Sequence, residues 1–236
     1  ALDLPADERA RITGASRPRP PVEPVRCLPA DLVTLVGRDE ELRSVLAVAA
    51  GDGRAHRRPV LVHGPAGAGT TSLLVRAAHR LAATVPAPVI HLDVRDLADA
   101  GDVARAVLAA LGEPPAATGV GPEPAPTPSA ALARLRGGVV VIDGVRSEDQ
   151  VAGLLYLPGP TVLLGSRGPL PGLAGVRRVP LYPLGPAASG ELLAAAAGRA
   201  RVDAEPEAVA ALLARCDGLP LALSLIAARI AARQDW

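Results

Sequence analysis

Residues 64–71 read Gly64-Pro65-Ala66-Gly67-Ala68-Gly69-Thr70-Thr71, a glycine-rich turn between two predicted elements. The segment before it, Pro59-Val60-Leu61-Val62-His63, is short, apolar and β-branched, which predicts a buried strand. After the turn we predict a helix from about Thr71 to Ala83. Glycines let backbone N–H groups curl around a phosphate, and a helix N-terminus adds partial positive charge. The stretch therefore predicts a phosphate-binding turn in an α/β fold.

One position of this turn departs from the P-loop pattern of nucleotide-binding proteins, which is G-x-x-x-x-G-K-[ST]. Thr71 falls where the P-loop hydroxyl ligates Mg²⁺, but Thr70 stands where the pattern has lysine. Glycine spacing alone is a weak signal, so a glycine-rich turn that holds no ligand is about equally consistent with these residues. Motifs elsewhere in the chain are needed to distinguish a phosphate-binding turn from a turn that holds no ligand.

A second motif follows farther along the chain. The run Val139-Val140-Val141-Ile142-Asp143 matches a Walker B strand, whose terminal aspartate would hold Mg²⁺ through water. Taken alone, the pattern favours an ordinary strand and turn by roughly two to one, because Asp-Gly is a common turn pair. Position 144 is glycine, so no carboxylate follows Asp143 that would polarise an attacking water.

Strands and helices alternate around these two motifs. Besides the strands at 59–63 and 139–143, we predict strands at 89–94, 161–164 and 176–179, which makes a parallel five-stranded sheet flanked by helices. The pattern is purely helical from residue 186. We therefore divide the chain into a Pro-rich linker at 1–30, a nucleotide-binding domain at 31–184 and a small helical subdomain at 185–236.

One arginine follows the predicted strand at 161–164. Strand C-termini converge on the ligand in α/β folds, so Arg167 is placed to sense a γ-phosphate. A solvated side chain is nevertheless the commoner fate of any single arginine.

Composition excludes several classes of protein. The chain has 25 Lys and Arg against 24 Asp and Glu, a net charge of +1, which predicts neither a strongly nucleic-acid-binding domain nor a membrane-surface domain. All of the basic residues are arginine. No apolar run reaches the roughly 18 residues that span a bilayer. Cys27 and Cys216 form no disulfide framework, which predicts a reduced, cytoplasmic setting. Because the chain does not begin with Met, we expect it to be part of a longer protein.

The motifs together resemble a known family. In chain order they match an NB-ARC domain, a STAND-type P-loop ATPase switch, and the carrying residues are Val36-Gly37-Arg38, the turn at 64–71, the strand at 139–143, Ser166-Arg167 and Gly218-Leu219-Pro220-Leu221-Ala222. Residues 27–31, 167–173 and 218–236 resemble most closely the SARP-type antibiotic-regulatory transcription activators of actinobacteria. The resemblance covers roughly residues 27–236.

The resemblance implies a ligand, partners and site residues. The ligand would be ADP or ATP with Mg²⁺, and DNA would be bound only through domains that precede residue 1. It implies no contact with a membrane and leaves self-association on activation open. The helical subdomain would be a truncated ARC unit. The implied site is Val36, Gly37 and Arg38 near the adenine; Gly64, Pro65, Gly67, Ala68, Gly69, Thr70, Thr71 and Ser72 around the phosphates; Thr71 and Asp143 at Mg²⁺; Arg167 as sensor; and Pro220 on the adenine or ribose.

Thr70 leaves three hypotheses open. Losing a charged hydrogen bond costs about 1.5–3 kcal/mol, roughly 10–150-fold in affinity, so we expect weakened nucleotide binding and at most a weak ATPase. A competent ATPase would need an arginine in place of the lysine, and Arg76, the nearest helical candidate, lies more than a turn beyond Thr71. The third hypothesis is a protein-interaction module that binds no nucleotide.

Overall fold

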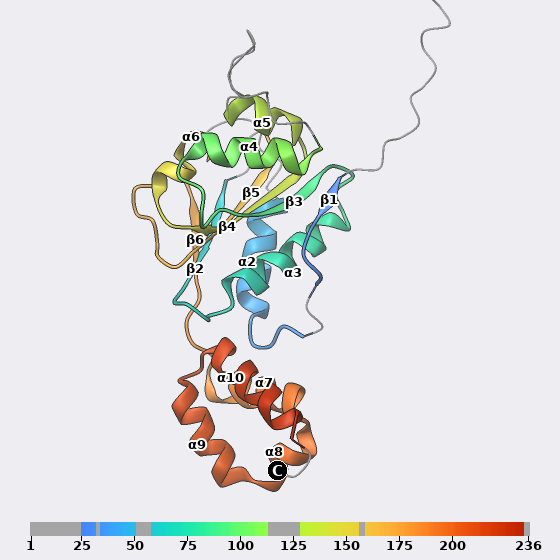
Figure 1. Cartoon of the computed structure of the whole chain (residues 1–236), viewed down its shortest axis with the longest axis vertical. Coiled ribbons are helices and arrows are strands. Elements are labelled where there is room, and N and C mark those ends of the chain that lie inside the picture. The colour runs from blue at the N-terminus through green and yellow to red at the C-terminus, as the bar shows by residue number, and fades with distance from the viewer. Residues whose placement is uncertain (1–24, 32–33, 51–57, 113–127, 156–158, 234–236) are drawn as a thin grey trace, which may run out of the picture.

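A six-stranded parallel sheet forms the centre of the computed structural model (Figure 1). The structure describes residues 25–31, 34–50, 58–112, 128–155 and 159–233. In spatial order the strands are β1-β3-β4-β5-β2-β6. Their bounds are Arg26–Cys27 for β1, Val60–His63 for β2, Val89–Asp93 for β3, Val139–Val145 for β4, Thr161–Ser166 for β5 and Arg177–Pro180 for β6.

The five predicted strands are all present, and the sheet has a sixth that the sequence did not indicate. Strand β1 pairs with the start of β3 and lies inside the segment predicted as linker. Two exposed residues are too few to show an alternating pattern, which is why β1 was missed. Nearby, the Pro29 carbonyl lies 2.8 Å from Nε2 of His79, so this part of the segment is held against the body. Residues 1–24 of the predicted linker lie outside the described residues.

Helices cover both faces of the sheet (Figure 1). Strand residues alternate between the faces, so Val139 and Val141 pack with one layer and Val140 and Ile142 with the other. The first layer is α2 (Asp39–Ala50) and α3 (Thr70–Ala82). The second is α4 (Ala100–Ala110), α5 (Pro128–Arg134), the 3₁₀ turn η1 (Glu148–Gln150) and α6 (Ala152–Leu155).

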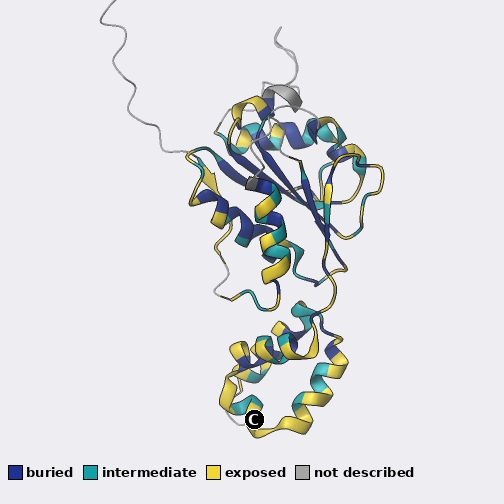
Figure 2. Ribbon diagram, turned by 180° about the vertical axis from the view of Figure 1, so that it is seen from behind, coloured by how far each residue is buried: buried dark blue, intermediate teal, exposed yellow. Residues whose placement is uncertain are grey.

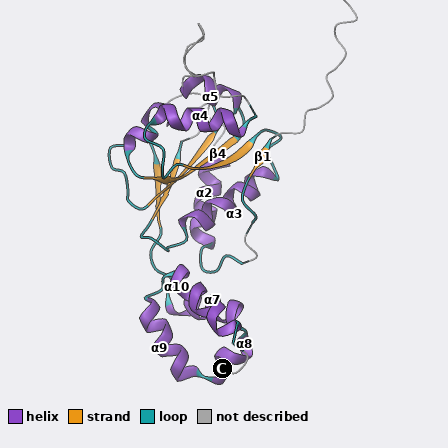
Figure 3. Cartoon of the chain, in the orientation of Figure 1, coloured by secondary structure: helices purple, strands orange, loops and turns teal. Residues whose placement is uncertain are grey.

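Beyond β6 the described chain is helical, as predicted (Figure 3). The helices are α7 (Pro186–Ala197), α8 (Arg199–Ala204), α9 (Pro206–Cys216) and α10 (Pro220–Ala231). Leu184, Cys216 and Leu223 form the buried centre of one small apolar cluster here. Figure 2 shows that burial concentrates in the sheet and its flanking helices, whereas this helical part is largely exposed. Among the described residues, no helix is both long and apolar enough to cross a bilayer.

Candidate functional site

Two adjoining pockets lie where β2, β3, β4 and β5 end and the helical part begins. The larger has a volume of about 760 Å³, and its lining includes the glycine-rich turn together with residues at the ends of β3, β4 and β5. The smaller has a volume of about 150 Å³ and is lined by residues 34–36, Arg38, the turn and the helical part. Both pockets are lined by Gly69, Ser72, Pro220 and Ser224. A single extended ligand would therefore contact residues far apart in the sequence.

The turn between β2 and α3 has a backbone that requires glycine. Gly67 has φ +85° and Gly69 has φ +94°, a left-handed conformation that side chains rarely adopt. A Cβ at Gly64 would lie 2.7 Å from the Leu181 carbonyl oxygen, so this position has no room for a side chain. Within the turn, the Ala68 N–H donates to the Pro65 carbonyl over 3.0 Å. The larger pocket is lined by Gly64, Pro65, Gly67 and Gly69, and the smaller one by Ala68.

The two side chains predicted at Mg²⁺ are in direct contact. The Thr71 hydroxyl donates to Oδ2 of Asp143 over 2.5 Å. Among the described residues, no group of three or more His, Cys, Asp and Glu is arranged to hold a metal. The Thr71 hydroxyl and the Asp143 carboxylate fit a cation that takes few protein oxygens and completes its shell with phosphate and water, as Mg²⁺ does.

Asp143 is held in its charged form by its neighbours. Burial raises the pKa of this carboxyl, but the His91 imidazole, the Thr71 hydroxyl and the Gly144 N–H outweigh burial and leave the pKa below its usual value. His91 Nε2 lies 3.8 Å from Asp143 Oδ2, which is too long for a hydrogen bond. The same nitrogen is buried and has no hydrogen-bond partner in the described chain. Asp143 is thus ready to accept a cation.

Two pocket residues, His91 and Asp93, were not predicted from the sequence to belong to the site. The register of β3 and β4 places Asp93 opposite Asp143, so a second carboxylate does reach the pocket from the neighbouring strand. Arg95 binds it through Nε at 2.9 Å and through a further short ion pair, and this side-chain contact holds the pKa of Asp93 below its usual value. A carboxylate occupied in this way is a poor base. An aspartate and a histidine at one strand end were the only available signal.

The predicted sensor and the predicted substitute for lysine have different surroundings. Arg167 is exposed and lines the larger pocket. Arg76 forms an ion pair with Asp31, with Nε 2.8 Å from the carboxylate, and lines neither pocket. It therefore does not stand in for the missing lysine.

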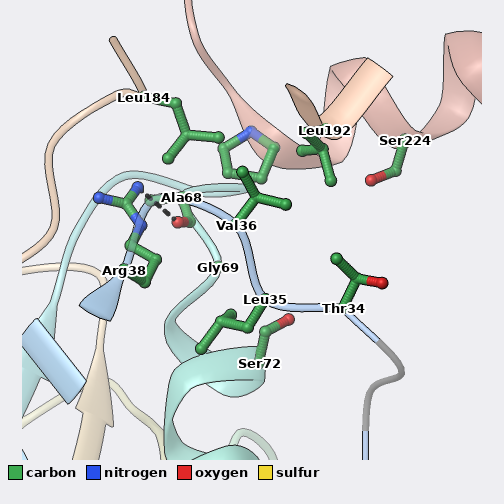
Figure 4. A pocket seen from close by; sticks show the side chains of 11 residues that line it. Thr34, Leu35, Val36, Arg38, Ala68, Gly69, Ser72, Leu184, Leu192 and Ser224 are labelled. Carbon is green, nitrogen blue, oxygen red and sulfur yellow. Dashed lines mark hydrogen bonds between the residues drawn. The ribbon is translucent and has the colours of Figure 1, made fainter. Parts of the chain in front are cut away.

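The smaller pocket brings together residues from opposite ends of the chain (Figure 4). Its apolar lining consists of Leu35 and Val36 from one side and Leu184, Leu192 and Pro220 from the other. Such a lining and volume suit a flat heterocyclic base. The predicted meeting of residues 36–38 with Pro220 is thus present, although Gly37 itself packs against Ala188 and does not line the pocket.

Arg38 lines the smaller pocket, but its guanidinium is engaged with protein (Figure 4). It donates to the Ala68 carbonyl over 3.1 Å and to the Tyr182 carbonyl over 2.6 Å, and it also pairs with Glu41 over 3.0 Å. These bonds connect the glycine-rich turn to the segment that enters the helical part. Arg38 therefore stabilises the walls of the site through its contacts with other groups of the protein.

The first turn of α10 lies directly on the glycine-rich turn. The Leu221 N–H donates to the Gly67 carbonyl over 3.2 Å. A Cβ added to Gly67 would lie 3.1 Å from Cβ of Leu221. The helical part thus forms one wall of both pockets.

Comparisons with known proteins give sequence relatives and structural neighbours of the chain. No protein-family model matches the chain. The chain is 34% identical over its whole length to the regulatory protein AfsR of Streptomyces griseus, and 30% identical over 89% of its length to that of Streptomyces coelicolor. It spans only 24% and 22% of those proteins, about a quarter of their length.

Solved structures show the same fold at lower identity. A STAND protein with a tetratricopeptide-repeat sensor from Pyrococcus horikoshii matches 84% of this chain and 30% of its own, with a TM-score of 0.53 and 20% identity. The RuvB Holliday junction branch migration motor of Thermotoga maritima matches 85% of this chain and 64% of its own, with a TM-score of 0.52 and 23% identity. The chain therefore shares its fold with these two proteins.

Proposed function

We propose that this chain, a homologue of the AfsR regulatory proteins with the fold of a STAND ATPase, is the adenine-nucleotide switch unit of a transcriptional regulator. The observation that carries the proposal is the pair of adjoining pockets, one for phosphates and one for a base, which share Gly69 and Pro220. The ligand is ADP or ATP with Mg²⁺.

Each part of the nucleotide has a matching part of the site. Backbone N–H groups of the turn at 64–71 and the N-terminus of α3 bind the phosphates. Thr71 and Asp143, already 2.5 Å apart, hold Mg²⁺, which neutralises phosphate charge when bound. The apolar walls formed by Val36 and Pro220 receive the adenine.

Hydrolysis on this site is very slow or absent. Thr70 brings no charge to the phosphates, and Gly144 brings no carboxylate to an attacking water. Asp93, the second carboxylate at the pocket, is occupied by Arg95 and stays ionised. The site is thus better suited to holding a nucleotide than to turning it over.

The rest of the regulator lies outside this unit. The net charge of +1 offers no strongly positive surface for the DNA backbone, so DNA recognition belongs to other segments of the regulator. A regulator that acts on DNA works in the cytoplasm. Whether nucleotide binding promotes self-association is a separate question, to be answered by light scattering with and without ATP.

Thermal unfolding and phosphate release test the proposed function together. Mg-ADP and Mg-ATP at saturation should each raise the melting temperature, because a ligand that binds only the folded chain stabilises it by mass action. Phosphate release should stay at the background rate. Thr71→Val should lose most of the Mg²⁺-dependent part of the shift, while the control Thr84→Val, at the end of α3, should not.

Two results would contradict the proposal. No shift at millimolar nucleotide would indicate an interaction module that binds no nucleotide. Steady turnover at rates typical of enzymes would indicate a competent ATPase.

A further inference from the structure

Two arginines follow the last paired residues of neighbouring strands at the larger pocket. Val145 and Ser166, the last residues of β4 and β5, pair with each other, and the residues that follow them in the chain are Arg146 and Arg167. Both arginines are exposed and both line the pocket.

A bulge in β4 sets this alignment. Ile142 pairs with Leu164 and Val145 with Ser166, so two residues of β4 lie opposite one residue of β5. Gly144, inside the bulge, has φ +81°, and a Cβ there would lie 2.4 Å from Cγ of Arg95. Only glycine fits both the conformation and the space. If the regular register continued past Ile142, Arg146 would lie opposite Gly168, one position past Arg167.

The backbone of Arg146 is fixed from below by a buried glutamine. Oε1 of Gln150 accepts hydrogen bonds from the N–H groups of Arg146 and Ser147, over 2.7 and 3.1 Å. Nε2 of the same side chain donates to the Val94 and Leu97 carbonyls, over 3.0 and 2.6 Å. Gln150 is only 2% exposed. The backbone that carries Arg146 at the pocket is therefore held in place by Gln150.

The positive charges of Arg146 and Arg167 have no acidic partner among the described pocket residues. Arg95 is occupied by Asp93, and Asp143 faces Thr71 and His91. Among the described residues, no hydrogen bond or ion pair engages the guanidinium of Arg146 or Arg167. Two arginines at neighbouring strand ends, without a counter-charge, suit a multiply charged anion, which arginine binds in a planar, two-pronged geometry.

We propose that Arg146, together with Arg167, binds the terminal phosphate of a bound nucleoside triphosphate and supplies the charge that Thr70 lacks. The inference rests on the proposed function, because it assumes that the pocket takes a nucleotide. It adds a specificity: the site distinguishes a triphosphate from a diphosphate through the arginine that follows β4.

Calorimetric titration with Mg-ADP and with the Mg complex of a non-hydrolysable ATP analogue tests the inference. Arg146→Ala should weaken binding of the analogue about 10-fold or more, the effect of removing a charged hydrogen bond, and should change ADP binding less than about twofold. Arg146→Lys should recover part of the loss. Arg215→Ala, at an exposed arginine of α9 outside both pockets, is the matched control.

A double variant tests the compensation itself. If Arg146 replaces the P-loop lysine, Thr70→Lys should restore triphosphate binding in the Arg146→Ala background. Equal affinities of the unmodified chain and Arg146→Ala would overturn the inference and leave the proposed function intact. An equal loss for ADP and the analogue would also overturn it. Failure of the unmodified chain to bind either nucleotide would contradict the proposed function, and the inference with it.

Discussion

A single charge separates residues 64–71 from a complete P-loop. The backbone positions that Gly67 and Gly69 occupy are those a phosphate cradle needs, and Thr71 and Asp143 are in contact at the same pocket. What is missing at Thr70 is a long cationic side chain. The absence of lysine from the whole chain is a trait of composition, yet at this one position it changes the chemistry of the site.

Restoring the lysine should strengthen nucleotide binding. Thr70→Lys places an ammonium group at the first turn of α3, beside the expected phosphates. Affinity for Mg-ATP should rise by roughly 10–150-fold, the effect of one added charged hydrogen bond. Competition with a fluorescent ATP analogue measures this change. An affinity equal to that of the unmodified chain would show that the turn does not hold phosphates near position 70.

The histidine that precedes the turn should make stability depend on pH. Burial, and then the charge of Arg178, lower the pKa of His63 below its usual value of 6.5. The unfolded chain therefore binds the proton more readily, and stability should fall as the pH drops through 6.5 toward the lower folded-state pKa. Urea unfolding at a series of pH values should show a smaller fall for His63→Gln. Identical pH profiles for the two chains would remove His63 as the cause.

The elements of the fold follow from the sequence more fully than the site does. Runs such as Val139–Ile142 are buried on both faces and continuously apolar, so the five longer strands could be predicted from residue type alone. Strand β1 could not, since its two residues carry no pattern.

The pocket residues that were not predicted from the sequence reach the site through strand pairing and strand register. His91 and Asp93 reach the pocket because β3 lies beside β4, and Arg146 does so because of one bulge. Neither the partner of a strand nor a bulge is visible in a single sequence. The motif residues themselves were predictable, because each motif is continuous along the chain.

Arg38 should contribute to stability as a brace between two elements. Arg38→Met would leave the Ala68 and Tyr182 carbonyls and the Glu41 carboxylate without their donor in a largely buried place. We expect a loss of about 2–4 kcal/mol in the free energy of unfolding, measured by urea denaturation. The control is Arg43→Met, at an exposed arginine of α2, the helix that begins directly after Arg38. Equal losses from both substitutions would contradict the bracing role.

The molecule as a whole consists of an α/β body and a helical part at the C-terminal end of the described chain (Figure 1). Residues of the helical part line both pockets. The Leu221 bond to Gly67 and the packing of Pro220 near Gly69 make α10 part of the site. A ligand that fills both pockets therefore connects the two parts, and this connection is a physical basis for a switch.

Nucleotide binding should protect helices that lie far from the turn in sequence. Hydrogen exchange of amides in α10 and in α7, which contributes Leu192, should slow when Mg-ADP is added. Amides of α4, on the other side of the sheet, should exchange at unchanged rates and serve as the internal control. Protection confined to residues 64–72 would show that the helical part takes no part in binding.

Whether the pocket binds an adenine nucleotide can be measured by equilibrium dialysis of the chain against radiolabelled ADP with Mg²⁺. Dialysis counts bound nucleotide without relying on a change in heat or stability. We expect one bound ADP per chain. Unlabelled ATP should displace this ADP, and Thr71→Val should weaken its binding. A folded chain, verified by circular dichroism, that retains no ADP at millimolar concentration would contradict it.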